Sequence, residues 1–186
     1  GRGGVPLPDL VPFDRLQGPA RARYVRDGAE ILTQWRLVRS ALFQLDTMEV
    51  LVSLLASGAC EKYPDFNFVL GESGVTWLPG FLWRISKFWR GVRAEVPWVD
   101  RSPADIVRDH VRLTITPFDA PDDGDTVERI IDQLRSDDLL LYASDFPHWQ
   151  FDGESAMPPG LPEGLQRKIL VENPLATYPR LKEAVS

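Results

Sequence analysis

The stretch LLLYASDFPHWQFD, residues 139–152, decides how we interpret the rest of the chain. Its first five residues are apolar and bounded by polar residues, which is typical of a buried strand in a parallel sheet. The carboxylate of Asp145 would then lie at the carboxyl edge of that sheet, where α/β folds place their chemistry. Pro147 turns the chain, so we expect His148 and Trp149 at the same edge. The stretch therefore predicts a functional site after a buried strand.

Composition and charge exclude several classes of protein. With 186 residues, 44% hydrophobic and 26% charged, the chain is long enough for a globular domain with a sizeable core. A formal net charge of -6 argues against nucleic acid as the main partner, because binding to phosphates needs a basic face. No run approaches eighteen consecutive apolar residues, so we expect no membrane span. The single cysteine, Cys60, cannot form an internal disulfide, which favours a buried thiol and a cytoplasmic location.

Strands and helices are expected to alternate along the chain. Apolar patterns predict strands at 66–70, 111–116 and 139–143, and helices at 79–90, 103–109, 125–134, 163–171 and 174–178. Helices are also expected within 20–43 and over 46–59, where Asp46 would be the N-cap, as Asp125 would be for its own helix. This order predicts an α/β fold with a parallel sheet, although three strands are too few to complete such a sheet.

Acidic residues follow the predicted strands. Glu72 comes just after the first strand, Asp119 after the second and Asp145 after the third. If the strands are parallel, Glu72 and Asp145 face one cleft, where they could bind a metal ion or act as a general acid and base. Two alternatives stay open, because Glu72 could instead cap the following helix and Asp145 the following turn. His110 and His148, the two histidines, cannot alone build a three-ligand zinc site.

The run from Trp83 to Arg93 is both basic and aromatic. This pattern occurs in helices that bind a partner or a membrane surface, and also in ordinary packing helices with a solvated basic face. We favour packing. The two interpretations differ at Trp89, which an interaction module would expose and a packing helix would bury.

Four segments together resemble the amidohydrolase-related family of metal-dependent TIM-barrel enzymes, the group that includes aminocarboxymuconate-semialdehyde decarboxylase. They are ASGACEKYPDFNFVLGESGVTWLPGFLWRI (56–85), HVRLTITPF (110–118), LLLYASDFPHWQFD (139–152) and LQRKILVENPLATY (165–178). The resemblance implies that the chain is the C-terminal half of a (β/α)8 barrel. Residues 46–186 would form barrel units six to eight, and residues 1–45 a loop and helical insertion. The family's His-x-His and its further histidine have no counterpart in this sequence.

The resemblance also assigns roles to individual residues. Asp145 would bind the metal, most often zinc, and accept a proton from its water. Glu72 stands where most members have a catalytic histidine, so it would move a proton or bind the metal. Arg84 would reach the substrate carboxylate in a neighbouring subunit of a homodimer. The remaining candidates for the substrate pocket are His148, Trp77 and Trp149.

We therefore expect a metal-dependent hydrolase that acts on a small carboxylated or cyclic substrate through a metal-activated water. A non-oxidative decarboxylase of the same family is the alternative, and a barrel that has lost its metal ligands is a third possibility. Because a half-barrel cannot complete the metal site, we expect this chain alone to be inactive.

Overall fold

The computed structural model describes residues 34–35, 38–39, 42–144, 146 and 157–185. The chain forms two compact units, residues 1–43 and residues 44–186. In the first unit, the residues that are described are helical, and the rest of the predicted 20–43 helical region lies outside them. The second unit holds every strand that the structure describes.

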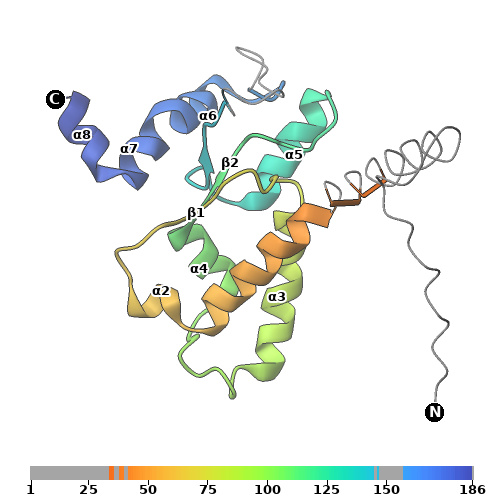
Figure 1. The fold of residues 1–186 in the computed structure, drawn as a ribbon, viewed down its shortest axis with the longest axis vertical. Coiled ribbons are helices and arrows are strands. Elements are labelled where there is room, and N and C mark those ends of the chain that lie inside the picture. Colours follow the sequence, from red (N-terminus) through yellow and green to blue (C-terminus); the bar gives the residue numbers. More distant parts are fainter. Residues whose placement is uncertain (1–33, 36–37, 40–41, 145, 147–156, 186) are drawn as a thin grey trace, which may run out of the picture. The chain divides into compact units, whose positions relative to one another are not determined.

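A parallel three-stranded sheet forms the centre of the second unit (Figure 1). Its strands are β1 (Phe68–Leu70), β2 (Val111–Thr114) and β3 (Leu140–Leu141), in that spatial order. Leu70 pairs with Leu113, and Leu113 in turn pairs with Leu140. The predicted α/β class and parallel pairing are confirmed, but each strand is shorter than its apolar run. The reason is that strand bounds follow the backbone hydrogen bonds, which end before the apolar pattern does.

Helices provide the connections between the strands. β1 leads into α3 (Leu78–Val92) and α4 (Pro103–His110), and β2 leads into α5 (Gly124–Leu134). α3 has a proline in its first turn, as predicted from Pro79, because proline lacks only an N–H that would be unsatisfied there. The predicted N-cap of α5 was wrong. Asp123, not Asp125, accepts the Thr126 backbone N–H, and Asp125 lies in the first turn.

The helix predicted over residues 46–59 also differs from its prediction. Residues 42–56 are helical, so Asp46 lies inside the helix and does not cap it. A turn at Ser57 and Gly58 follows the helix, and the φ of 69° at Gly58 is a left-handed conformation that glycine adopts without strain. The Trp98 indole N–H donates to the carbonyl of Ala56, which satisfies one of the last carbonyls of the helix. Cys60 then lies in the short helix α2 (Ala59–Lys62) and is buried, and this burial raises the pKa of its thiol.

The C-terminal part is a run of short helices: α6 (Glu163–Arg167), the π-helix η3 (Lys168–Glu172), α7 (Asn173–Thr177) and α8 (Pro179–Val185). In η3 the Asn173 N–H donates to the carbonyl of Lys168, five residues earlier, which widens the turn. The Ile169 carbonyl accepts from the Tyr142 N–H at 3.2 Å. The wide turn therefore lies against the chain just after β3.

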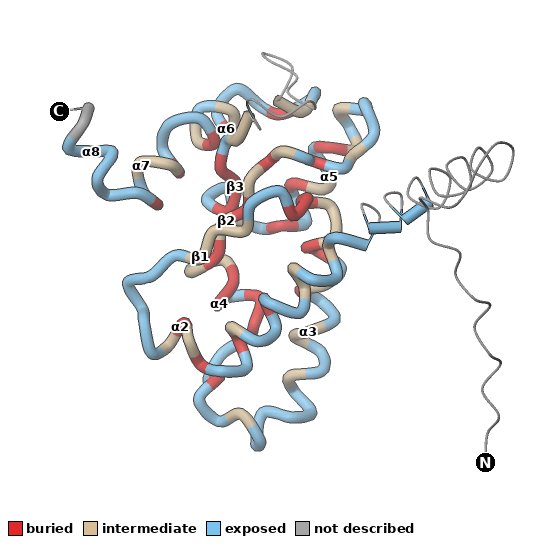
Figure 2. The backbone as a smooth tube through the Cα atoms, in the orientation of Figure 1, coloured by how far each residue is buried: buried red, intermediate tan, exposed pale blue. Residues whose placement is uncertain are grey.

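Burial is concentrated on β2, on β3 and on one face of the helices around the sheet, whereas β1 is only partly buried (Figure 2). β2 alternates buried and partly buried residues, as predicted, and α5 buries Val127, Ile131 and Leu134 at helical spacing. Trp89 packs against this core, and its indole N–H donates to the Val99 carbonyl at 3.1 Å, which agrees with the packing interpretation. Among the helices that the structure describes, none has the length and apolar character needed to cross a membrane.

Candidate functional site at the carboxyl edge of the sheet

The carboxyl ends of the three strands meet at one edge of the sheet, because the strands are parallel. Three loops leave this edge: the loop that begins at Gly71, the loop that begins at Ile115 and the loop that begins at Tyr142. Glu72 and Asp119, two of the acidic residues predicted to follow strands, lie in the first and second of these loops. The candidate site therefore consists of residues in these three loops.

Glu72 occupies the first loop in a left-handed backbone conformation, with φ of 54°. Its backbone N–H donates to the Thr114 hydroxyl at 3.0 Å, which joins this loop to the end of β2. The side chain is exposed, and its carboxylate has no hydrogen bond or ion pair with the residues that the structure describes. Within the described part of the chain, no side chain therefore competes with a ligand for this carboxylate.

Asp119 lies in the second loop and is also left-handed, with φ of 63°. Its carboxylate accepts from the Gln44 side-chain amide at 2.9 Å, so the helix over residues 42–56 holds it in place. The Asp119 carboxylate lies against Gly74, where only glycine fits, since a Cβ at Gly74 would lie 2.2 Å from Asp119 Oδ2. This contact joins the first two loops a second time, and it depends on glycine.

The third loop is joined to the second by a threonine. The Thr116 hydroxyl donates to the Ala143 carbonyl, and the Ile115 N–H donates to the Leu141 carbonyl at 3.0 Å. Asp145, His148 and Trp149 lie outside the described residues. The predicted approach of Asp145 to Glu72 therefore stays a prediction.

Trp77 and Arg84, two predicted substrate contacts, lie on or beside α3. The Trp77 indole N–H donates to the carbonyls of Ser73 and Gly74, at 2.8 and 3.1 Å, so its ring fixes the Glu72 loop and has no N–H left for a substrate. Arg84 is exposed, with its guanidinium carbon 4.9 Å from the centre of the Phe88 ring. These contacts leave the predicted roles of both residues in substrate binding untested.

A metal ion is the ligand that the sequence predicted for this edge. The described residues contain no group of three histidine, cysteine, aspartate or glutamate side chains that could hold one. Glu72 nevertheless has a carboxylate that no described residue binds, and carboxylate oxygens are suitable ligands for zinc, manganese or magnesium. His110 cannot contribute, because it lies at the start of β2, at the opposite edge of the sheet.

Sequence reasoning missed Thr114, Thr116 and Gln44. The alternation of HVRLTITPF does place the two threonines on one face of the strand, which was the available signal. Their partners could not be read from the sequence, because Thr114 contacts a residue 42 positions away and Gln44 a residue 75 positions away.

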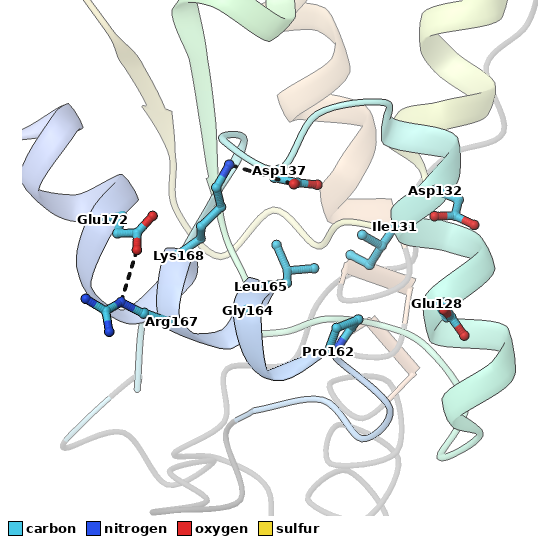
Figure 3. Close-up of a pocket in the computed structure, with 10 residues that line it drawn as sticks. All are labelled: Glu128, Ile131, Asp132, Asp137, Pro162, Gly164, Leu165, Arg167, Lys168 and Glu172. Atoms are coloured by element: carbon cyan, nitrogen blue, oxygen red, sulfur yellow. Dashed lines mark hydrogen bonds and ion pairs between the residues drawn. The ribbon is translucent and has the colours of Figure 1, made fainter.

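A separate groove of about 440 Å³ lies between α5 and the α6 and η3 helices (Figure 3). Lys168 pairs there with Asp137 and Asp138, and Arg167 pairs with Glu172. The hydrogen bond to Asp138 raises the pKa of Lys168. None of the predicted site residues lines this groove, and these ion pairs account for its basic groups.

Comparison with known proteins identifies the family of this chain. The model of the family described as amidohydrolase matches residues 10–180. The chain belongs to this family. No curated protein matches the sequence.

Several solved structures share the fold. An amidohydrolase from Mycobacterium avium subsp. paratuberculosis K-10 is 21% identical with a TM-score of 0.58, over 80% of this chain and 38% of that one. The 2,6-dihydroxybenzoate decarboxylase from Rhizobium is 22% identical with a TM-score of 0.57, over 75% and 42%. A dihydroxybenzoic acid decarboxylase from Polaromonas sp. JS666, solved with bound manganese and the inhibitor 2-nitroresorcinol, is 23% identical with a TM-score of 0.55, over 89% and 48%.

These likenesses concern the fold, and the chain spans less than half the length of the three structures. The family prediction is confirmed. The assignment of β1, β2 and β3 to barrel strands six, seven and eight stays a prediction, as does the division at residue 45.

Proposed function

We propose that this chain supplies barrel units six to eight of a metal-dependent enzyme that removes a carboxylate from a small aromatic or cyclic acid without oxidation. Membership of the amidohydrolase family supports a metal-dependent reaction, and decarboxylases recur among the solved structures of similar fold. This proposal puts the decarboxylase alternative ahead of the hydrolase. The observation that carries it is the exposed carboxylate of Glu72 in the loop at the carboxyl edge of the sheet, which no described residue binds and which could there act as a proton donor.

Decarboxylation of such an acid replaces a carboxylate with a proton. The proton is added to the ring carbon that bears the carboxylate, the bond between that carbon and the carboxylate breaks, and CO2 leaves. Glu72 would deliver this proton or bind the metal, and Asp145 would bind the metal. When bound, a divalent ion such as manganese or zinc would orient and polarise the oxygens of the substrate. Trp77 would keep the Glu72 loop in place through its two hydrogen bonds.

Hydrolysis is the second candidate, because the family description favours it. The two reactions differ in their products, since only decarboxylation releases CO2. A homodimer and a cytoplasmic location stay predictions for either enzyme.

The proposal is tested with the complete gene product loaded with Mn²⁺ or Zn²⁺. We expect CO2 release from 2,6-dihydroxybenzoate or 5-carboxyvanillate, used as probes, and no turnover after chelation of the metal. Glu72→Gln should lower kcat by about 100-fold or more, because a general acid contributes about 10²–10⁴. Glu128→Gln, at an exposed position on α5, is the matched control and should be unaffected.

The metal content of the variants separates the roles of the two acids. Asp145→Asn should lose both metal and turnover. If Glu72→Gln keeps its metal, Glu72 moves the proton, and if it loses the metal, Glu72 is a ligand. Full metal occupancy with unchanged turnover in Asp145→Asn would refute the site, and turnover of an amide or lactone without any CO2 release would favour the hydrolase.

A further inference from the structure

We infer that Thr114 is a positioning residue, which sets the location of the Glu72 carboxylate by holding the backbone of its loop, and that Thr116 anchors this arrangement to the end of β3. The inference rests on the proposed function for its catalytic consequence. The contact itself can be measured without any substrate.

The two threonines continue the links between strands beyond the point where the backbone ladder ends. Thr114 is the last residue of β2, and its hydroxyl accepts from the Glu72 N–H at 3.0 Å and donates to the Thr116 carbonyl at 3.4 Å. The Thr116 hydroxyl donates to Ala143, two residues before Asp145 in the sequence. Side-chain hydroxyls thus connect all three loops across the carboxyl edge.

The alternation of β2 places both hydroxyls where they can do this. Leu113 and Ile115 are buried on one face, while Thr114 and Thr116 are partly buried on the other. Thr114 uses its hydroxyl as both acceptor and donor, so its orientation is fixed from two sides. Valine would fill the same volume but offer neither group.

Glu72 needs such a contact because its backbone is left-handed, a conformation that costs energy for a residue with a Cβ. The hydrogen bond from its N–H to Thr114 holds this conformation and therefore the direction of its side chain. Without the bond, the loop can relax and move the carboxylate. A displacement of about 1 Å in a catalytic group can cost about 100-fold in rate.

Hydrogen exchange tests the contact directly. In the complete protein, Thr114→Val should speed the exchange of the Glu72 amide by about fivefold, which is the loss of one hydrogen bond of ordinary strength, and Thr114→Ser should restore the protection. Thr177→Val is the matched control, because among the described residues the buried Thr177 hydroxyl has no hydrogen-bond partner. Unchanged exchange in Thr114→Val would overturn the inference whether or not the proposed activity is found.

Kinetics test whether Thr114 acts through Glu72. Thr114→Val should lower kcat by about 10- to 100-fold with little change in KM or metal content, and Thr114→Ser should recover most of this loss. In the Glu72→Gln background, the same substitution should have no further effect. An equal loss in both backgrounds, or a failure of serine to rescue, would show that Thr114 has only a structural role.

Discussion

Replacing Asn173 by alanine should destabilise the second unit strongly, because this buried amide closes the outer edge of β3. The carbonyls of Leu139 and Leu141 accept from the backbone N–H groups of Leu113 and Ile115, at 2.8 and 3.0 Å, so the carbonyl of Leu140 points the other way. The Asn173 side-chain amide donates to Leu140 at 2.9 Å and to the Asp137 carbonyl at 2.8 Å. Alanine would leave the Leu140 carbonyl buried without this donor.

The expected loss is about 3 kcal/mol in the free energy of unfolding. It combines about 1 kcal/mol for the net value of the bond to Asp137 with about 2 kcal/mol for the buried carbonyl of Leu140 that loses its donor. Urea denaturation of the metal-free complete protein, followed by tryptophan fluorescence, measures it. Asn67→Ala is the matched control, since Asn67 is the other asparagine of the chain and is exposed, and it should change stability by less than about 0.5 kcal/mol.

Asn173→Asp separates the donor from the volume of the side chain. Aspartate has almost the shape of asparagine but offers no N–H when ionised, and it places a charge beside two carbonyls. We expect it to destabilise at least as much as alanine does. If Asn173→Ala and Asn173→Asp both stay within 0.5 kcal/mol of the wild type, the amide does not support β3 and the reasoning fails.

Three further outcomes test other parts of the second unit. Gly160→Ala should lower the free energy of unfolding by about 3 kcal/mol or more, because φ is +77° and a Cβ would lie 2.2 Å from the Gly124 backbone. Gly80→Ala, in open space on α3, should be neutral or stabilising by up to about 1 kcal/mol in the same unfolding assay. The hydrogen bond from Thr126 lowers the pKa of Asp123, so this N-cap stabilises the fold above about pH 4 and loses its effect as the pH falls. The Tm difference between wild type and Asp123→Ala should therefore shrink from pH 7 to pH 3. A constant Tm difference would contradict this. Cys60 is buried and burial raises its pKa, so a thiol reagent at pH 8 should label it only after unfolding, and rapid labelling of the folded protein would be the contrary result.

The sequence predicted the parts of the fold that depend on local pattern. The apolar runs near Leu70, Leu113 and Leu140 gave the positions of the strands, and Pro79 correctly marked the start of α3. Boundaries that depend on competing local signals were wrong. At α5, both Asp123 and Asp125 have the chemistry of a cap, and the backbone conformation that selects Asp123 is not visible in the sequence.

The site was predicted less completely, because its contacts join distant segments. Glu72 was placed correctly after β1, since strand order alone puts it there. Its partner Thr114 and the pairing of Gln44 with Asp119 require the register of β1 against β2 and the position of the preceding helix. Those are tertiary features, which no local pattern specifies.

The wide turn η3 holds one residue more than an ordinary helical turn needs. Removing one residue between Lys168 and Glu172 would allow ordinary α-helical geometry, and the helices on either side would keep nearly the same rotation about their axis. Leu165 and Asn173 could then both stay buried. A single-codon deletion in η3 should therefore be tolerated better than one inside α5, where it would break the helical spacing of Val127, Ile131 and Leu134.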